Sequence, residues 1–243
     1  MRKYLLSVII LSGFFFFSSC RMNVLKGEGN KVTNTPTVPP FNAVVVDLSL
    51  KVVVDVQDGA QPSVAISGYE NLLKHITTKV ENNTLTISDD LDETWTIECK
   101  DVVVKITVPS IAALNLRGAP DAEIHGNIKG PDFKLDISGA SDVTIDNASV
   151  DNLTIKFSGA ANVSIKAGTV KTAEYRISGT GDIDAKKLEA NEVNAVISGA
   201  GNIDVWAVQK LDAKVSGTGS IYYKGNPVVT KHVSGSGTIS EAK

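Results

Sequence analysis

A short phrase built around a Ser-Gly pair recurs along the second half of this chain at an almost fixed spacing. Its copies are ISGASDV, FSGAANV, ISGTGDI, ISGAGNI, VSGTGSI and VSGSGTI, with the serines at positions 138, 158, 178, 198, 216 and 234. Three intervals are therefore twenty residues long and two are eighteen. A degenerate copy, LRGAPDAEI, precedes them at 116–124. Repetition at a fixed period of this size is typical of stacked-repeat proteins and constrains the fold more than any other feature.

Apolar and polar residues alternate on both sides of each phrase. In the copy that starts at Phe133, Leu135 and Ile137 alternate with charged residues, and Val143 and Ile145 resume the pattern after the phrase. A period of two indicates half-buried strands, so each repeat is predicted to hold two short strands and two corners. One repeat alone cannot bury its apolar face, whereas stacked repeats can. The sequence therefore predicts an all-β fold, a single-stranded parallel β-helix (β-solenoid) of about twenty residues per turn.

The residue before each Ser-Gly pair is predicted to point into the core, and the glycine to form a structural corner. The predicted interior column is Ile137, Phe157, Ile177, Ile197, Val215 and Val233. The predicted corner glycines are Gly118, Gly139, Gly159, Gly179, Gly199, Gly217 and Gly235. Such a corner needs a residue that tolerates φ > 0 and has no Cβ to clash with the turn above. Short polar residues that follow, among them Asp142 and Asn162, suit the same corner; a stack of cation sites is the alternative.

The N-terminal residues have the features of an export signal. Arg2 and Lys3 precede an apolar run, which ends in Ser-Ser and Cys20. This arrangement resembles a bacterial lipoprotein signal over 1–20, in which Cys20 carries the lipid; a cleaved soluble protein or an uncleaved anchor are the alternatives. Residues 21–40 are polar and contain glycine and proline, which predicts a flexible tether. We therefore expect a lipid-anchored protein of the cell envelope, in the outer membrane, facing either the periplasm or the surface.

Composition argues against several classes of function. The net charge is −3 and both signs are interspersed, so neither nucleic-acid binding nor a polybasic membrane patch is indicated. The three histidines are far apart, and no spacing typical of a zinc site or a phosphate loop occurs. Cys99 lies in an alternating segment, which predicts a buried, inert thiol. No catalytic, cofactor or metal site is predicted.

Residues 41–115 are less regular than the repeats of 116–243. They are predicted to form wider, irregular turns of the same solenoid domain, 41–243, with one helical turn over 69–76; a separate packed β-domain is the alternative. The segments SGYENLLKHI and VKITVPSIAALNL, followed by serial SGxG[DN]I repeats, resemble the putative auto-transporter adhesin, head GIN domain family of Bacteroidetes. The resemblance implies a right-handed β-helix on an exported protein, often a lipoprotein. It implies no enzymatic activity and no cofactor.

The function expected from these features is that of a non-enzymatic, adhesin-like binding or interaction module with a glycan or protein ligand. Trp206, Tyr222 and Tyr223 form the predicted interaction patch, whereas Trp95 is expected to fill the core. One alternative is a lyase or glycosidase that acts on polysaccharides. Its candidate carboxylates are Asp142, Asp182, Asp184 and Asp204. The other alternative is a purely structural envelope protein.

The C-terminal end of the solenoid has no visible capping helix. An uncovered last turn exposes core and unpaired strand edges. We therefore expect this end to be covered by a second copy of the chain, by a partner, or by Lys224, Lys231 and Glu241. End-to-end dimerisation is favoured because it would bury the edge strand.

Overall fold

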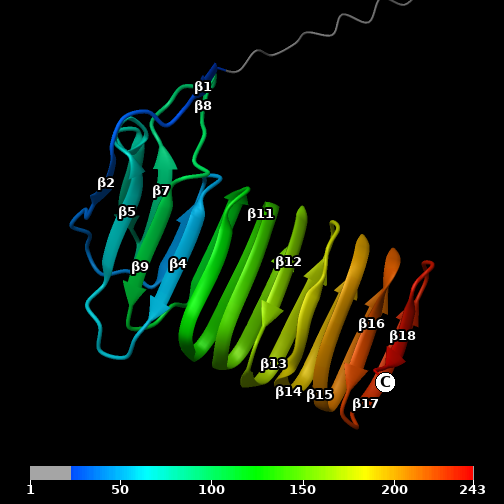
Figure 1. The fold of residues 1–243 in the computed structure, drawn as a ribbon. Helices are drawn as coiled ribbons and strands as arrows, with labels where there is room; N and C mark the ends of the chain where they lie inside the picture. The colour runs from blue at the N-terminus through cyan, green and yellow to red at the C-terminus, as the bar shows by residue number, and fades with distance from the viewer. Residues whose placement is uncertain (1–22, 243) are drawn as a thin grey trace, which may run out of the picture.

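The computed structural model describes residues 23–242 and has the form of a β-solenoid whose coils lie side by side along one axis (Figure 1). About six turns of roughly twenty residues are stacked in parallel, which confirms the predicted fold. Nearly all strands belong to one continuous hydrogen-bonded sheet of 16 strands. The buried apolar residues form a single core that runs from Phe41 to Ile221.

The elements follow one another in an order that places the irregular part first. The N-terminal part holds β1 (Asn23–Leu25), β2 (Lys31–Asn34), β3 (Ala43–Val46), β4 (Lys51–Val56), β5 (Ser63–Tyr69), α1 (Glu70–Leu73), β6 (Ile76–Glu81), β7 (Thr84–Asp89), β8 (Trp95–Ile97), β9 (Val103–Val108) and β10 (Ala113–Gly118). The repeats hold β11 (Asp121–Phe157), β12 (Ala160–Ile165), β13 (Gly168–Ile177), β14 (Ile183–Ile197), β15 (Ala200–Val215), β16 (Thr218–Lys224), β17 (Val228–Val233) and β18 (Thr238–Glu241).

The column of residues before the Ser-Gly pairs stacks as predicted. Phe157 pairs with Ile177, which pairs with Ile197, and Val215 continues the column. These residues and Ile137 are at most 3% exposed. Val233 keeps the register but is 44% exposed, so the prediction of burial is wrong there. Val233 lies in the last turn, and none of the described residues covers it.

Each regular turn contains a third short paired segment that the sequence pattern did not reveal. Gly168 pairs with Ala148 on one side and with Leu188 on the other, and Val170 pairs with Ala190. The change from a twenty-residue to an eighteen-residue turn takes place in this segment, where the register shifts after Ala185 and again after Ala190. The two longer strands of each turn therefore keep their inward columns aligned while the repeat length changes.

The glycine of the Ser-Gly pair is required for close approach, not for its backbone angle. A Cβ atom built on Gly179 would overlap the carbonyl oxygen of Gly159 in the preceding turn, and the same holds for Gly139, Gly159, Gly199, Gly217 and Gly235. None of these six has a positive φ, so that part of the prediction is wrong. Positive φ occurs instead at Gly118 (+80°) and at the second glycine of the phrase, as at Gly181 (+122°). Within the Ser-Gly phrases and their degenerate copy, positive φ is found at Gly118, Gly181, Gly201 and Gly219.

A buried serine near this corner yields a prediction about stability. Ser141 is 5% exposed, pairs with Ala161 of the next turn, and its hydroxyl has no hydrogen-bond partner among the described residues. Ser141→Ala should raise the free energy of unfolding by about 1 kcal/mol, because an unsatisfied buried hydroxyl is removed. Urea titration followed by circular dichroism checks this, with exposed Ser149→Ala as the control. A less stable Ser141→Ala variant would indicate that the hydroxyl has a partner.

The irregular N-terminal part begins the same solenoid and then closes its end. β3 and β4 pair in parallel with β10 and β11 of the first regular turn, and β7 and β9 stack on their other side. Beyond them the pairing becomes antiparallel, between β2 and β5, between β5 and β9, and between β6 and β7. The predicted helical turn is confirmed as α1, which buries Leu72 and Leu73. The irregular part thus pairs with the first regular turn, and antiparallel strands lie at its edge in place of the predicted wider turns.

Two parts of the predicted flexible tether, β1 and β2, are paired strands. β2 pairs antiparallel with β5, and β1 pairs in parallel with β8. The side chain of Asn71 accepts a hydrogen bond from the backbone N–H of Glu28 (2.9 Å) and donates one to the carbonyl of Lys26 (2.7 Å). Val32 and Val38 pack against the core. The segment is ordered because it covers an edge strand that would otherwise be unpaired.

The predicted lipoprotein signal over 1–20, with Cys20, lies outside the described residues. Within residues 23–242 no helix has the length and apolar character needed to cross a bilayer. Cys99 is buried, as predicted, and burial, followed by the charge of Asp89, raises the pKa of its thiol to about 12.

The last turn carries an exposed charged residue, Lys231, in a column that is interior in the preceding turn. Lys231 pairs with Ala213, which is fully buried, so its side chain stands on the core side of β17. Its Nζ donates to the carbonyl of Ile239 (3.1 Å) and lies 5.2 Å from the centroid of the Tyr223 ring. Inward-pointing charges are one way in which natural sheets prevent association through their edges. This geometry supports self-protection of the C-terminal end, whereas the end-to-end dimer stays a prediction.

Light scattering distinguishes these two arrangements. If Lys231 protects the end, the full chain in detergent should carry one copy per micelle, and Lys231→Leu should shift it toward dimers by exposing an apolar last turn. Lys214→Leu, an exposed position on the outer side of β15, should leave the chain monomeric. A dimer of the unaltered chain that Lys231→Leu does not change would instead support end-to-end dimerisation.

Candidate binding groove

Short polar side chains after the Ser-Gly corner form a ladder of hydrogen bonds from turn to turn. Asn162 Nδ2 donates to Asp142 Oδ1 (2.8 Å), and the backbone N–H of Asn202 donates to Asp182 Oδ1 (2.7 Å). The ladder continues through Ser220, whose hydroxyl lies 2.9 Å from that of Thr238. Residues 23–242 contain no group of three or more side chains suited to a metal ion. The hydrogen bonds of the ladder satisfy polar groups at the corner from one turn to the next.

The structure brings the candidate carboxylates together on the outer face of the second strand of each turn. Asp184 pairs with Asp204 of the next turn, and Asp142, Asp182 and Asp184 line a shallow hollow of about 310 Å³. Burial, followed by the charge of Asp184, raises the pKa of Asp204. However, Asp184 is paired with Lys186 (2.8 Å), and Asp182 belongs to the ladder. The carboxylates of Asp182 and Asp184 are therefore occupied by contacts within the protein.

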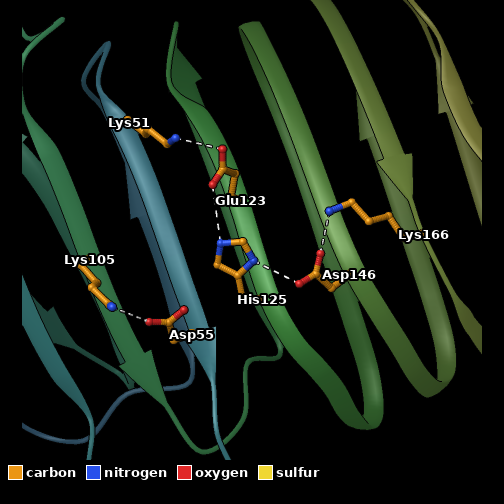
Figure 2. Close-up of polar contacts among 7 residues, drawn as sticks. All are labelled: Lys51, Asp55, Lys105, Glu123, His125, Asp146 and Lys166. Atoms are coloured by element: carbon orange, nitrogen blue, oxygen red, sulfur yellow. Dashed lines mark hydrogen bonds and ion pairs between the residues drawn. The ribbon is translucent and has the colours of Figure 1, made fainter.

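A network of alternating charges crosses neighbouring turns around His125, as Figure 2 shows. Glu123 contacts Lys51 (2.9 Å) on β4, and His125 Nδ1 lies 3.0 Å from Asp146, which also accepts from Lys166 (2.9 Å). The hydrogen bond from Lys51 lowers the pKa of Glu123, and that from Lys166 lowers the pKa of Asp146. Each carboxylate has a cationic partner, so this cluster ties strands of adjacent turns to one another.

Of the predicted aromatic patch, Trp206 and Tyr222 lie on the outer face of adjacent turns, whereas Tyr223 lies on the core side. Tyr222 is 37% exposed and pairs with Asp204 on the outer face. Tyr223 pairs with buried Val205 and packs against the core. Trp206 is half-buried, and Lys224 Nζ lies 3.9 Å from the centroid of its ring.

Trp95 also differs from its predicted role. It is 42% exposed, so the prediction that it fills the core is wrong. Trp95 belongs to β8, which pairs only with β1 among the described strands, in a two-stranded sheet separate from the solenoid. An alternating pattern alone did not reveal that this segment leaves the stack.

A groove of about 380 Å³ lies on the outer face of the first strand of each turn, beside the Ser-Gly corner. It spans β10, β11 and β13. Its charged residues are Arg117, Asp136, Lys156 and Arg176, and Ser138, Ser158 and Ser178 follow its length. The remaining lining comes from Asn115, Leu116, Ile137 and Phe157. Stacking therefore gathers residues that are about twenty positions apart in the sequence.

The groove has more positive than negative charge. Three of its lining residues are cations and one, Asp136, is an anion, which is paired with Lys134 (2.7 Å) outside the groove. Lys156 (3.1 Å) and Arg176 (2.5 Å) share a single carboxylate, that of Glu174. Burial acts to raise the pKa of Glu174, but the hydrogen bonds from Arg176 and Lys156 outweigh it and lower the pKa. Arg117 has only a long contact with Asp47 (3.4 Å).

This groove was not predicted from the sequence. In the sequence, Asp136, Lys156 and Arg176 are separated charges of both signs, a pattern that is usually just a solvated surface. The available signal was the twenty-residue spacing of Lys156 and Arg176, which places them side by side on adjacent turns. The position of Arg117 follows only from the register of β10, where it pairs with Ser138.

Several solved structures are similar to this chain. A putative adhesin from Bacteroides fragilis is 26% identical with a TM-score of 0.85, over 90% of this chain and 100% of that one. A putative lipid binding protein from Parabacteroides distasonis is 24% identical (TM-score 0.75, 91% and 100% covered), and a putative adhesin from the same species is 22% identical (TM-score 0.70, 90% and 100% covered). The latter two establish the shared fold alone.

The family comparison points in the same direction as the resemblance noted in the sequence. A comparison with curated proteins gives no match. The profile described as "Putative auto-transporter adhesin, head GIN domain" matches residues 40–227. This description and the name of the Bacteroides fragilis relative favour an adhesin-like, non-catalytic role and an extracellular or envelope location. The chain belongs to the putative auto-transporter adhesin, head GIN domain family.

Proposed function

We propose that this protein is a lipid-anchored, adhesin-like binding module of the cell envelope, and that it binds its ligand on the outer face of the solenoid. The observation that carries this proposal is the groove, where three cations lie close together and Lys156 and Arg176 share one carboxylate. In the hollow and in the His125 network, the carboxylates accept hydrogen bonds from neighbouring groups of the protein. In the groove, two cations share one carboxylate and the cations remain accessible. Accessible positive charges on a rigid scaffold suit the binding of a ligand better than catalysis.

The fold supports such a role because it presents side chains in straight rows. Equivalent residues of successive turns lie about 4.8 Å apart, the spacing of neighbouring strands. The backbone is held on both sides by hydrogen bonds between turns, such as Ser178 N–H to the Phe157 carbonyl (2.9 Å). A ligand that contacts several turns would meet groups that are already in place, which reduces the entropic cost of binding.

Binding to an array of purified polysaccharides and matrix proteins tests the proposal. The full chain in detergent should bind at least one immobilised class saturably, and heat-unfolded protein should not. Failure to bind any class, together with an envelope that becomes sensitive to detergent when the protein is deleted, would instead favour the purely structural alternative.

The anchor is tested separately through Cys20. Cys20→Ala should abolish labelling of the protein by a radioactive fatty acid and release it from the membrane fraction, because one thioether-linked lipid site is removed. Cys99→Ala is the matched control and should keep its label, since Cys99 is buried. Label that persists in Cys20→Ala would disprove the lipid-anchor assignment. Protease treatment of intact cells then tells surface exposure from a periplasmic location.

A further inference from the structure

We infer that the groove beside the Ser-Gly corner is a site for an anionic polysaccharide, whose acidic groups bind Arg117, Lys156 and Arg176 and whose hydroxyls bind Ser138, Ser158 and Ser178. The inference rests on the proposed binding function and specifies its ligand class. Its first support is the alignment of the groove with the solenoid axis. Arg117 and Arg176 lie three turns apart, which corresponds to roughly 14 Å at the spacing of neighbouring strands. A chain-like anion fits this length better than a single small one.

The second support is the hydrogen-bonding capacity that remains in the groove. A guanidinium carries five N–H donors in a planar fork that matches acidic groups. Arg176 uses its Nε toward Glu174, and Arg117 uses one terminal nitrogen in a contact of 3.4 Å. Both guanidinium groups therefore retain donors that can face a ligand. Lys156 stands next to Arg176 on the adjacent turn and adds a third charge.

The third support is the row of serines along the same groove. Ser138, Ser158 and Ser178 are exposed and occupy one column, beginning beside Arg117. A hydroxyl both donates and accepts, so a row of them suits the repeated hydroxyls of a sugar chain. The groove thus offers cationic side chains for the acidic groups of a sugar chain and serine hydroxyls for its hydroxyl groups.

The composition of the groove disfavours other polymers. None of its lining residues is tyrosine or tryptophan, and Phe157 is 3% exposed, so stacking with bases or neutral sugars has little support. The three cations of the groove are too few for a polybasic membrane patch. An extended peptide would need an open sheet edge, whereas the groove lies on a face whose strands are paired on both sides.

The test measures binding of the full chain in detergent to polygalacturonate by isothermal titration calorimetry. Fully methyl-esterified polygalacturonate is the matched neutral probe, and dextran sulfate tells sulfate from carboxylate recognition. We expect binding to at least one anionic probe, at least tenfold weaker binding to the neutral one, and weakening by added salt. Lys156→Gln with Arg176→Gln should weaken binding at least tenfold. Ser158→Ala should weaken it severalfold.

Lys214→Gln is the matched control variant, because Lys214 lies in the same outward column but outside the groove. It should change the affinity less than twofold, and circular dichroism should confirm that every variant is folded. Equal weakening by Lys214→Gln, no difference between charged and neutral probes, or tighter groove-dependent binding of single-stranded DNA would overturn the inference. If the variant with Lys156→Gln and Arg176→Gln still bound the array of polysaccharides and matrix proteins, the inference would also be overturned. The proposed binding function would then remain intact.

Discussion

Gly179→Ala should destabilise the protein by more than about 4 kcal/mol or prevent its folding, an exceptional cost for adding a single methyl group. The new Cβ would overlap the carbonyl oxygen of Gly159, and a backbone atom cannot move aside as a flexible side chain can. The turns would have to separate, which would break hydrogen bonds and open the core beneath the corner. Urea titration followed by circular dichroism measures the loss.

The neighbouring serine provides the control for this substitution. Ser178 is exposed, so Ser178→Ala should change the free energy of unfolding by no more than about 0.5 kcal/mol. The outcome for Gly179→Ala also separates two explanations of the corner. Strain from the left-handed region would cost about 1–2 kcal/mol and should not arise at Gly179, whose φ is not positive, whereas overlap between turns should cost several times more. A variant within 1 kcal/mol of the parent would mean that adjacent turns can separate locally without loss of structure.

Ile155→Ala should cost about 2–5 kcal/mol, the usual range for removing a large aliphatic side chain from a packed core. Ile155 is fully buried and pairs with Tyr175, which is itself buried, in the middle of the stack. Since each turn contacts only its neighbours, a cavity here should also weaken the coupling between the two halves of the solenoid. Urea unfolding should therefore shift to lower concentration and become less steep.

Ile155→Val is the conservative comparison and should cost about 0.5–1.5 kcal/mol with an unchanged slope. An unchanged slope for Ile155→Ala would mean that the solenoid still unfolds as one unit. A loss below 1 kcal/mol would mean that the core relaxes to fill the space.

The sequence predicted the parts of this fold that depend on periodicity. Alternation and the twenty-residue spacing were sufficient to place Ile137, Phe157 and Ile177 in one interior column. They could not reveal pairing between distant segments, such as β2 with β5, because that pairing depends on which edge is left open. Nor did they separate the two demands on the corner, which fall on different glycines: close approach at Gly179 and positive φ at Gly181.

The candidate groove was harder to predict for a related reason. In the sequence, Lys156 and Arg176 are indistinguishable from ordinary surface charges. The register places them side by side on adjacent turns, and Glu174 forms an ion pair with each. The aromatic residues gave the opposite impression, since Trp206, Tyr222 and Tyr223 are close in sequence. Alternation sends Tyr222 outward and Tyr223 toward the core, so proximity along a strand does not make one surface.

The position of the groove along the solenoid determines which turns would carry mechanical load. The covalent chain winds around the axis, whereas the hydrogen bonds between turns run along it. Tension between an N-terminal anchor and a ligand held at Arg117–Ser178 would therefore be borne by inter-turn hydrogen bonds and not by the backbone. The turns beyond Ser178 lie outside this path. They would act as an unloaded tail that keeps the core of the loaded turns covered.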